Sequence, residues 1–332
     1  MKRIDAYWYS QNPVAWLLLP VSTLYCLLAF TRRLCYRTGI LKSYKLPVPI
    51  IIVGNITVGG TGKTPLLIAL CELLKQQGYR PGVVSRGYGG DFHGERLVET
   101  GDQANVIGDE PFLISRRSRS PLVVGRDRVA AAQLLLDKSD CNIILSDDGL
   151  QHYRLRRDIE IAIVDASRQF GNGFCIPSGP LRETVSRLEQ VDIVVDHFSG
   201  TAPGREYNFS LQFNDAINLK TGESRSIENF IGAPVHAVAG IGHPSRFFNQ
   251  LRTSRVEVIE HDFPDHHQFT SSDLSFGDEF QVLMTEKDAV KCRQFSTERL
   301  WYVPVDAKLS DHFQQQLLSR VKQCIESGAS SV

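Results

Sequence analysis

A glycine-rich run between an apolar stretch and a helical pattern constrains this chain more than any other feature. Residues 57–64 read TVGGTGKT, directly after the apolar run at 47–55 and directly before the helical spacing of 65–77. Glycines let successive backbone N–H groups converge on a phosphate, lysine adds a positive charge, and a threonine hydroxyl can bind Mg²⁺. The run therefore predicts a loop that binds a nucleotide phosphate through Thr57, Val58, Gly59, Gly60, Thr61, Gly62, Lys63 and Thr64.

The loop departs from the GxxxxGK[ST] pattern at its first position, where Thr57 replaces glycine. Its place between a strand and a helix still favours phosphate binding over a fortuitous glycine turn. Such a site also needs an acid after an apolar strand, and residues 143–148 read IILSDD. Asp147 and Asp148 point to opposite sides if the strand continues, so we expect only one of them to bind the metal. Together these residues predict hydrolysis or transfer of a nucleotide phosphate.

Strand and helix patterns alternate along most of the chain, which predicts an α/β fold with a P-loop NTPase-like parallel sheet covered by helices on both faces. We expect a hydrophobic segment at 1–46, a nucleotide-binding domain at 47–200, a polar linker with a small hairpin at 201–230, and a smaller α/β domain at 231–332. The predicted strands are 47–55, 82–85, 122–124, 142–146, 159–164, 193–195, 235–239, 256–259, 281–285 and 300–303; the predicted helices are 65–77, 128–137, 181–190, 244–252 and 310–325.

Composition and charge exclude several classes of protein. The chain has 332 residues, of which 42% are hydrophobic and 22% charged, as in a folded globular protein. Its 37 basic and 37 acidic residues give no net charge, so no global field attracts nucleic acid and we expect no nucleic-acid partner. Seven scattered cysteines form no CxxC pair, which argues against a disulfide framework and a zinc site.

The segment 13–30 carries no charge over 18 residues. As a helix it would be about 27 Å long, marginal for a hydrocarbon core of about 30 Å. More basic residues follow the segment than precede it, so its downstream side would face the cytoplasm. We expect a membrane anchor or a helix lying in the interface, two cases that the sequence does not separate, with a helix buried in the fold as the alternative. The basic residues are Arg32, Arg33, Arg37, Lys42 and Lys45 after it, against Lys2 and Arg3 before it.

Eight blocks of the sequence carry a family resemblance. They are GNITVGGTGKTP (54–65), SRGYGG (85–90), GDEP (108–111), DDGLQH (147–152), PLRE (180–183), GIGHPSRFF (240–248), FPDHHQF (263–269) and TEKDAV (285–290). In this order they resemble the tetraacyldisaccharide 4′-kinases of Gram-negative bacteria. The resemblance implies transfer of the γ-phosphate of ATP, with Mg²⁺, to the 4′-hydroxyl of the lipid A disaccharide 1-phosphate, giving lipid IVA in lipid A biosynthesis. It also implies an enzyme held at the cytoplasmic face of the inner membrane by its N-terminus, and no protein partner is inferred.

The same resemblance implies roles for individual residues. Asp109 of the GDEP block and His266 of the FPDHH block would form a dyad that activates the sugar hydroxyl. A histidine with a pKa near 6.5, oriented by a carboxylate, suits the removal of a hydroxyl proton. Because Asp109 lies in the first domain and His266 in the second, we expect the site in the cleft between them. The metal environment would consist of Thr64, Glu110 and one of Asp147 or Asp148.

Two other classes of protein remain open from the loop alone. A switch ATPase of the partitioning type normally has a lysine just before its paired glycines, where this chain has Val58, and it would need a nucleotide-dependent dimer. A soluble kinase for a small metabolite fits the loop but not the apolar N-terminus.

Five arginines near predicted strand ends are candidates for neutralising a substrate phosphate, and the sequence assigns none of them a fixed contact. They are Arg86, Arg126, Arg128, Arg154 and Arg182.

Overall fold

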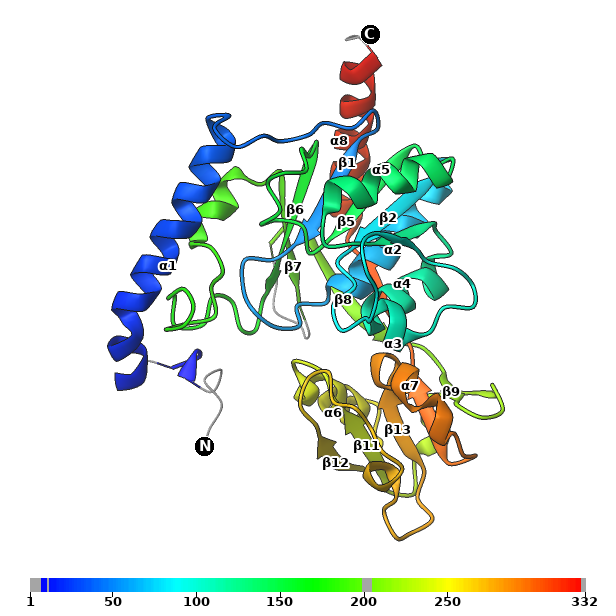
Figure 1. The fold of residues 1–332 in the computed structure, drawn as a ribbon. Helices are drawn as coiled ribbons and strands as arrows, with labels where there is room; N and C mark the ends of the chain where they lie inside the picture. The colour runs from blue at the N-terminus through cyan, green and yellow to red at the C-terminus, as the bar shows by residue number, and fades with distance from the viewer. Residues whose placement is uncertain (1–6, 11, 199–204, 330–332) are drawn as a thin grey trace.

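The computed structural model describes residues 7–10, 12–198 and 205–329, which form two lobes stacked on one another (Figure 1). The larger lobe holds a nine-stranded sheet with the spatial order β15 (Val305–Leu309), β8 (Asn208–Phe213), β7 (Ile193–His197), β6 (Ile159–Asp165), β1 (Ile50–Gly54), β5 (Ile143–Asp147), β2 (Pro81–Ser85), β4 (Leu122–Val124) and β3 (Arg96–Leu97). The smaller lobe holds a six-stranded sheet with the order β10 (Ser224–Arg225), β9 (Ala216–Asn218), β14 (Leu300–Val303), β13 (Val282–Thr285), β11 (Val235–Ala239) and β12 (Val258–Asp262).

Both sheets are parallel in their interior and antiparallel only toward an edge. In the larger sheet the antiparallel strands are β15 and β3, and in the smaller sheet they are β9 and β10. Parallel strands are buried on both faces, which explains the continuous apolar run of β1. Ile51 and Val53 join the core on one face, whereas Ile50 and Ile52 join the core on the other. The predicted α/β class, with a P-loop NTPase-like sheet and a second, smaller α/β lobe, is confirmed.

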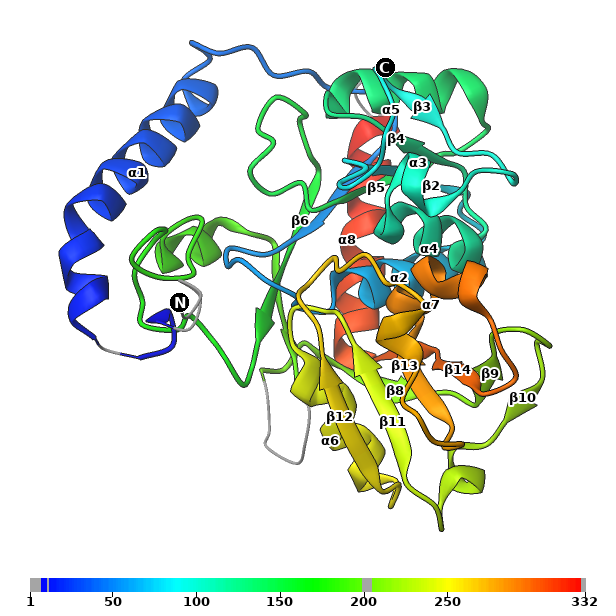
Figure 2. The same ribbon diagram turned by 60° about the horizontal axis from the view of Figure 1, so that its bottom comes forward.

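Helices cover both faces of the larger sheet, as Figures 1 and 2 show. On one face, α2 (Lys63–Gln76), α4 (Asp109–Ser118) and α8 (Asp311–Ala329) bury Leu66, Phe112 and Phe313. On the other face, α5 (Arg128–Lys138) buries Leu135. The remaining elements are α1 (Pro13–Arg37), α3 (Ala104–Ile107), α6 (Pro244–Thr253), α7 (Glu286–Cys292), and the short 3-10 helices η2 (Val185–Gln190), η3 (Ile227–Phe230), η4 (Ser272–Leu274) and η5 (Arg293–Phe295).

Three stretches differ from the sequence prediction. The expected linker 201–230 supplies β8, which pairs with β7 in the larger sheet, as well as the β9–β10 hairpin of the smaller one; its residues 201–204 lie outside the described residues. The end of the expected second domain, 231–332, returns to the larger lobe, because β15 pairs with β8 and α8 buries apolar residues against the larger sheet. The expected helix 181–190 is only the 3-10 helix η2.

The chain crosses between the lobes at two neighbouring points. It leaves the larger lobe after β8 and returns to it at β15, and Phe213 of the first strand is paired with Val305 of the second. Two short connections side by side form a narrow joint, about which two lobes can move with small backbone changes. This topology agrees with the expected site in the cleft between the two lobes.

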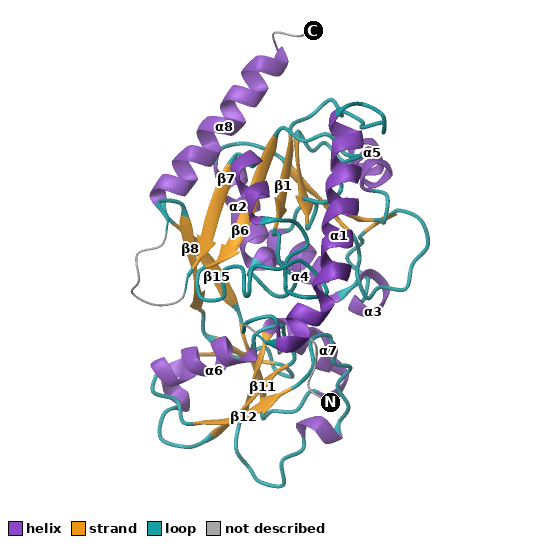
Figure 3. Cartoon of the chain, turned by 90° about the vertical axis from the view of Figure 1, so that its left-hand side faces the viewer, coloured by secondary structure: helices purple, strands orange, loops and turns teal. Residues whose placement is uncertain are grey.

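Helix α1 stands along the flank of the larger lobe and exposes most of its apolar surface (Figures 1 and 3). Only Ala15 and Ser22 are buried, while Leu17 is 79% exposed and Leu28 is 60% exposed. Ser22 Oγ donates to the carbonyl of Cys175 at 2.7 Å, and the hydroxyl of Tyr25 donates to the carbonyl of Arg182 at 3.1 Å. With 11% of its most apolar window buried, α1 is not a core helix; by length and composition it is one helix able to cross a membrane among the described residues. Lys2 and Arg3 lie outside the described residues.

Candidate active site

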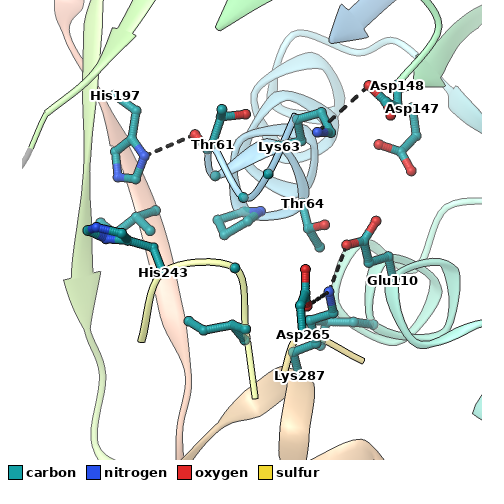
Figure 4. Close-up of a pocket in the computed structure, with 18 of the residues that line it drawn as sticks. Thr61, Lys63, Thr64, Glu110, Asp147, Asp148, His197, His243, Asp265 and Lys287 are labelled. Atoms are coloured by element: carbon teal, nitrogen blue, oxygen red, sulfur yellow. Dashed lines mark hydrogen bonds and ion pairs between the residues drawn. The ribbon is translucent and has the colours of Figure 1, made fainter. Parts of the chain in front are cut away.

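The predicted phosphate loop lies between the end of β1 and the start of α2. Lys63 is the first residue of α2, and Gly62 precedes it with a φ of 86°, a conformation that favours glycine. The N-terminus of a helix presents backbone N–H groups and a positive dipole end, which together attract phosphate. In Figure 4, Lys63 and Thr64 face a space that is bordered on its far side by the carboxylates of Asp147 and Glu110.

His197, at the end of β7, holds the backbone of this loop. Its Nδ1 lies 2.9 Å from the carbonyl oxygen of Thr61, and its ring stacks on Phe209 with 4.7 Å between centroids. Burial, followed by the charge of Arg246, lowers the pKa of His197 to about 4, so the ring is neutral at pH 7 and can donate from Nδ1 to Thr61. A Cβ at Gly62 would come within 2.9 Å of the same nitrogen. No sequence signal marked this histidine, because a single histidine at a strand end is common.

The adjacent acids Asp147 and Asp148 have different partners. Asp148 accepts a hydrogen bond from Arg182 at 2.9 Å and lies 3.7 Å from Lys63 Nζ. The Oδ2 of buried Asp147 accepts from Ser85 at 2.9 Å, whereas its Oδ1 has no hydrogen-bond partner. Burial raises the pKa of Asp147 to about 6, and the nearby carboxylates of Glu110 and Asp148 add to the effect. An unpaired buried oxygen costs free energy that a bound cation would recover.

The oxygens around this space fit a magnesium ion. Among the residues that the structure describes, no three His, Cys, Asp or Glu side chains come close enough to hold a metal by themselves. Mg²⁺ is usually held by one or two carboxylates together with water and phosphate oxygens, so a complete protein cage is not needed. Thr64, Glu110 and Asp147 offer hard oxygen atoms of this kind. Since Lys63 already faces Asp148, Asp147 is the better candidate of the adjacent acids.

Asp109 and His266 meet from the two lobes. Asp109 is the first residue of α4 in the larger lobe, and His266 follows β12 in the smaller lobe. Asp109 Oδ2 and His266 Nδ1 are 3.7 Å apart, somewhat longer than a hydrogen bond. His266 has a φ of 61°, which is uncommon without glycine, and its ring lies 5.2 Å from that of Tyr88. The two residues come together, and their catalytic role stays a prediction.

A cavity of about 1440 Å³ opens between the lobes. It is lined by residues 58–64 of the loop, by Glu110, and by His266, and it extends to Tyr25 and Arg32 of α1. Thr57 is buried beneath it and pairs with Leu181 instead. Four of the five candidate arginines line the cavity, whereas the fifth forms an ion pair with Asp127. The four are Arg86, Arg126, Arg128 and Arg182, and the fifth is Arg154.

The smaller lobe reaches the phosphate loop through the GIGHPSRFF block. A Cβ on Gly242 would lie 2.9 Å from the backbone nitrogen of Gly60, so the two segments are nearly in contact. Arg246 of α6 forms an ion pair with Asp165 at the end of β6 and lies 3.1 Å from His197. These contacts tie the smaller lobe to the loop from the side opposite Asp147. The block was singled out by resemblance, but nothing in its pattern indicated this docking.

Known proteins match nearly the whole chain. The profile of the family described as Tetraacyldisaccharide-1-P 4'-kinase matches residues 14–322. The chain belongs to this family. Proteins named Tetraacyldisaccharide 4'-kinase are 50% identical in Nitrosococcus oceani, over 96% of this chain and 94% of the relative, and 47% identical in Methylobacillus flagellatus, over 97% of each. The family membership expected from the eight blocks is confirmed.

A solved structure of the same 4′-kinase family has the same fold. It is described as the "apo" form of LpxK from Aquifex aeolicus in complex with ATP, and it is similar with a TM-score of 0.78 and 28% sequence identity. The match covers 93% of this chain and 99% of that chain. The two-lobed arrangement described above is therefore that of the 4′-kinase family.

Replacing the buried acid, Asp147→Asn, is expected to stabilise the metal-free protein while abolishing phosphate transfer. The folded-state pKa of about 6 lies above the ordinary value of 3.8, so the ionised carboxylate destabilises the fold above pH 6, and this cost disappears as the pH falls from 6 toward 4. In thermal unfolding with EDTA, the free energy of unfolding of the variant should exceed that of the wild type by about 1–3 kcal/mol at pH 8, and this difference should vanish near pH 4. A variant less stable than the wild type at pH 8 would contradict this account of Asp147.

Proposed function

We propose that this chain transfers the γ-phosphate of ATP to the 4′-hydroxyl of a tetraacyldisaccharide 1-phosphate, giving lipid IVA in lipid A biosynthesis. The observation that carries the proposal is the convergence, in one cleft of a 4′-kinase fold, of residues 58–64 of the loop, the acids Asp147 and Glu110 on its far side, and the Asp109–His266 pair. The ATP named for the solved relative supports ATP as the donor.

In the proposed mechanism each residue acts on a stated atom. Lys63 contacts the β- and γ-phosphates, and the N-terminus of α2 binds their oxygens. His266, oriented by Asp109, accepts the proton of the 4′-hydroxyl as its oxygen attacks the γ-phosphorus; the bond to the β–γ bridging oxygen breaks, and ADP leaves. Thr64, Glu110 and Asp147 would hold Mg²⁺, which when bound neutralises charge on the phosphate oxygens.

We also propose that α1 holds the protein at the cytoplasmic face of the inner membrane. Its exposed apolar surface would otherwise face water, and the basic residues at its C-terminal end suit anionic headgroups. Tyr25 and Arg32 line the same cavity as the phosphate loop, so an acceptor anchored in lipid beside α1 has a continuous path to Lys63. This continuity favours a lipid acceptor over a small soluble metabolite.

Two charges on the exposed side of α1 are expected to release the protein from membranes. The double variant Leu17→Asp/Leu28→Asp places carboxylates at positions that are 79% and 60% exposed, each of which costs about 2.5–3.5 kcal/mol in hydrocarbon. Flotation with vesicles that contain anionic lipid should show most of the variant in the soluble fraction. Gln315→Asp/Gln323→Asp, on exposed positions of α8, should still float with the vesicles. Equal flotation of the two double variants would contradict the proposal.

The proposal that the chain is a kinase predicts that ATP turnover depends on the acceptor. With Mg²⁺ and detergent, ADP should form when the tetraacyldisaccharide 1-phosphate is added, and at least about ten times more slowly when it is omitted, because water is not positioned near His266 without the acceptor. Equal ADP formation with and without acceptor would favour the switch ATPase and contradict the proposal.

A further inference from the structure

Lys287 reaches from the smaller lobe to the larger one and pairs with the sequence neighbours of the candidate dyad. Its ammonium lies 3.0 Å from Glu110 Oε1 in the larger lobe and 3.4 Å from Asp265 Oδ1 in its own lobe. Figure 4 shows these three side chains meeting below Thr64. In the sequence Glu110 directly follows Asp109, and Asp265 directly precedes His266. The TEKDAV block contains this lysine, and the mechanism proposed above gives it no part.

The first turn of α7 is anchored within the smaller lobe. Thr285, the last residue of β13, caps the helix by accepting a hydrogen bond from the backbone N–H of Asp288 at 3.2 Å. The fully buried Asp288 in turn accepts from the backbone N–H of Gly240 at 2.8 Å, at the end of β11. Lys287 therefore projects from a fixed turn, so the position of its ammonium reports the position of the whole lobe.

The same turn contacts α4 through a second ion pair, in which the acid lies on α7 and the base on α4. Glu286 lies 2.6 Å from Arg117, which is seven residues after Glu110 and so on the same face of α4. Two neighbouring residues of α7, one acidic and one basic, thus pair with a basic and an acidic residue of α4. Such a pattern fixes both the approach and the rotation of one helix against the other, because sliding by two turns, the spacing of Glu110 and Arg117, would bring Lys287 to Arg117.

Removal of the Lys287 charge would leave the carboxylates of the two lobes without the ammonium that lies between them. Asp109 and Glu110 from one lobe would face Asp265 from the other, and like charges at this distance repel. The Lys287 side chain is 17% exposed, so solvent screens the interaction only in part. Burial alone lowers the pKa of Lys287, but Glu110 and Asp265 outweigh it and hold the pKa above its usual value, which keeps the ammonium charged.

We propose that Lys287 is a positioning residue, whose bridge between Glu110 and Asp265 sets the distance between Asp109 and His266. The inference rests on the proposed function, because it concerns the geometry of the proton transfer in that reaction. A displacement of about 1 Å between reacting groups can lower a rate by about 10²-fold. The ion-pair partners of Lys287, Glu110 and Asp265, lie outside the phosphate loop, so the KM for ATP should change less than kcat.

The test compares Lys287→Met, Lys287→Arg, Asp265→Asn and the double variant Lys287→Met/Asp265→Asn in the full chain in detergent. Lys287→Met should lower kcat by about 10–10²-fold with the KM for ATP within about threefold of the wild type. Lys287→Arg should keep most of kcat, because it keeps the charge. The double variant should recover part of the loss, because Asp265→Asn removes one of the repelling carboxylates. Lys322→Met, on an exposed position of α8, serves as the matched control.

A second readout does not depend on activity. Hydrogen–deuterium exchange of residues 263–268 should accelerate in Lys287→Met and not in Lys322→Met, while exchange in β5 stays that of the wild type. A wild-type kcat in Lys287→Met would overturn the inference. So would a loss of kcat in the double variant that exceeds the product of the losses in the two single variants. If the wild type transferred no phosphate, the proposed function would fail instead, and unchanged exchange at 263–268 would then overturn the role of Lys287 by itself.

Discussion

His266→Ala is expected to lower kcat by about 10²–10⁴-fold, the usual contribution of a general base, while the dissociation constant for ATP stays within about twofold. His266 belongs to the smaller lobe and faces Asp109, whereas the phosphate loop belongs to the larger lobe. The two effects therefore separate: proton removal is lost, and nucleotide binding persists. Single-turnover transfer with a saturating acceptor, together with equilibrium binding of ATP, measures both quantities.

The neighbouring histidine provides the control for this experiment. His267 bonds Asp273 at 3.2 Å within its own lobe and packs on Phe263 and Phe269, away from Asp109. His267→Asn keeps a hydrogen-bonding side chain and should retain kcat within about threefold. Wild-type kcat in His266→Ala, or an equal loss in both variants, would contradict the assignment of the base.

Lys63→Met is expected to lower kcat/KM by about 10²–10³-fold, the typical cost of removing one positive group that stabilises a transferring phosphate. Lys63 Nζ lies 3.2 Å from Asn55 Oδ1 and 3.7 Å from Asp148, which hold its ammonium in the cavity. Because charge on the phosphate oxygens is redistributed during transfer, we expect the loss mainly in kcat. Steady-state kinetics at varied ATP concentration separate the effect on kcat from the effect on the KM for ATP.

A lysine on the same helix offers a matched control. Lys75, in the last turn of α2, lies 3.3 Å from Glu72 at the far end of the helix from the phosphate loop. Lys75→Met removes the same charge from α2 and should change kcat/KM by less than about threefold. A Lys63→Met variant with more than half of the wild-type kcat/KM would contradict the role given to the loop.

The parts of the fold that follow from local pattern could be predicted. Within the run 47–55, the residues that pair with neighbouring strands are apolar or glycine, and TVGGTGKT follows them. The strand, the loop and the helix could therefore be identified together. The strand ending in Asp147 and Asp148 has the same apolar character, and it pairs with β1 so that Val53 lies beside Asp147. This pairing explains why the phosphate loop, which begins at Thr57, and the acid Asp147, about 90 residues later in the chain, meet at one edge of the sheet.

The parts that depend on long-range pairing could not be predicted. β8 is only partly buried and joins the larger sheet because β7 and β15 flank it, although β15 lies about 100 residues later in the chain. Nothing in the polar sequence around 208 indicates that partner. The same limit hid the contacts of His197 with Thr61 and of Lys287 with Glu110, because each joins single residues from separate elements.

The position of the transferred phosphate tests the central claim most directly. The wild-type protein is incubated with Mg²⁺, ATP labelled in its γ-phosphate, and the tetraacyldisaccharide 1-phosphate in detergent, and the lipid product is examined by mass spectrometry and by phosphorus–proton correlation NMR. The account predicts one labelled phosphate added to each acceptor, bonded through the oxygen at carbon 4′. Label recovered only as inorganic phosphate, or on another hydroxyl of the disaccharide, would contradict it.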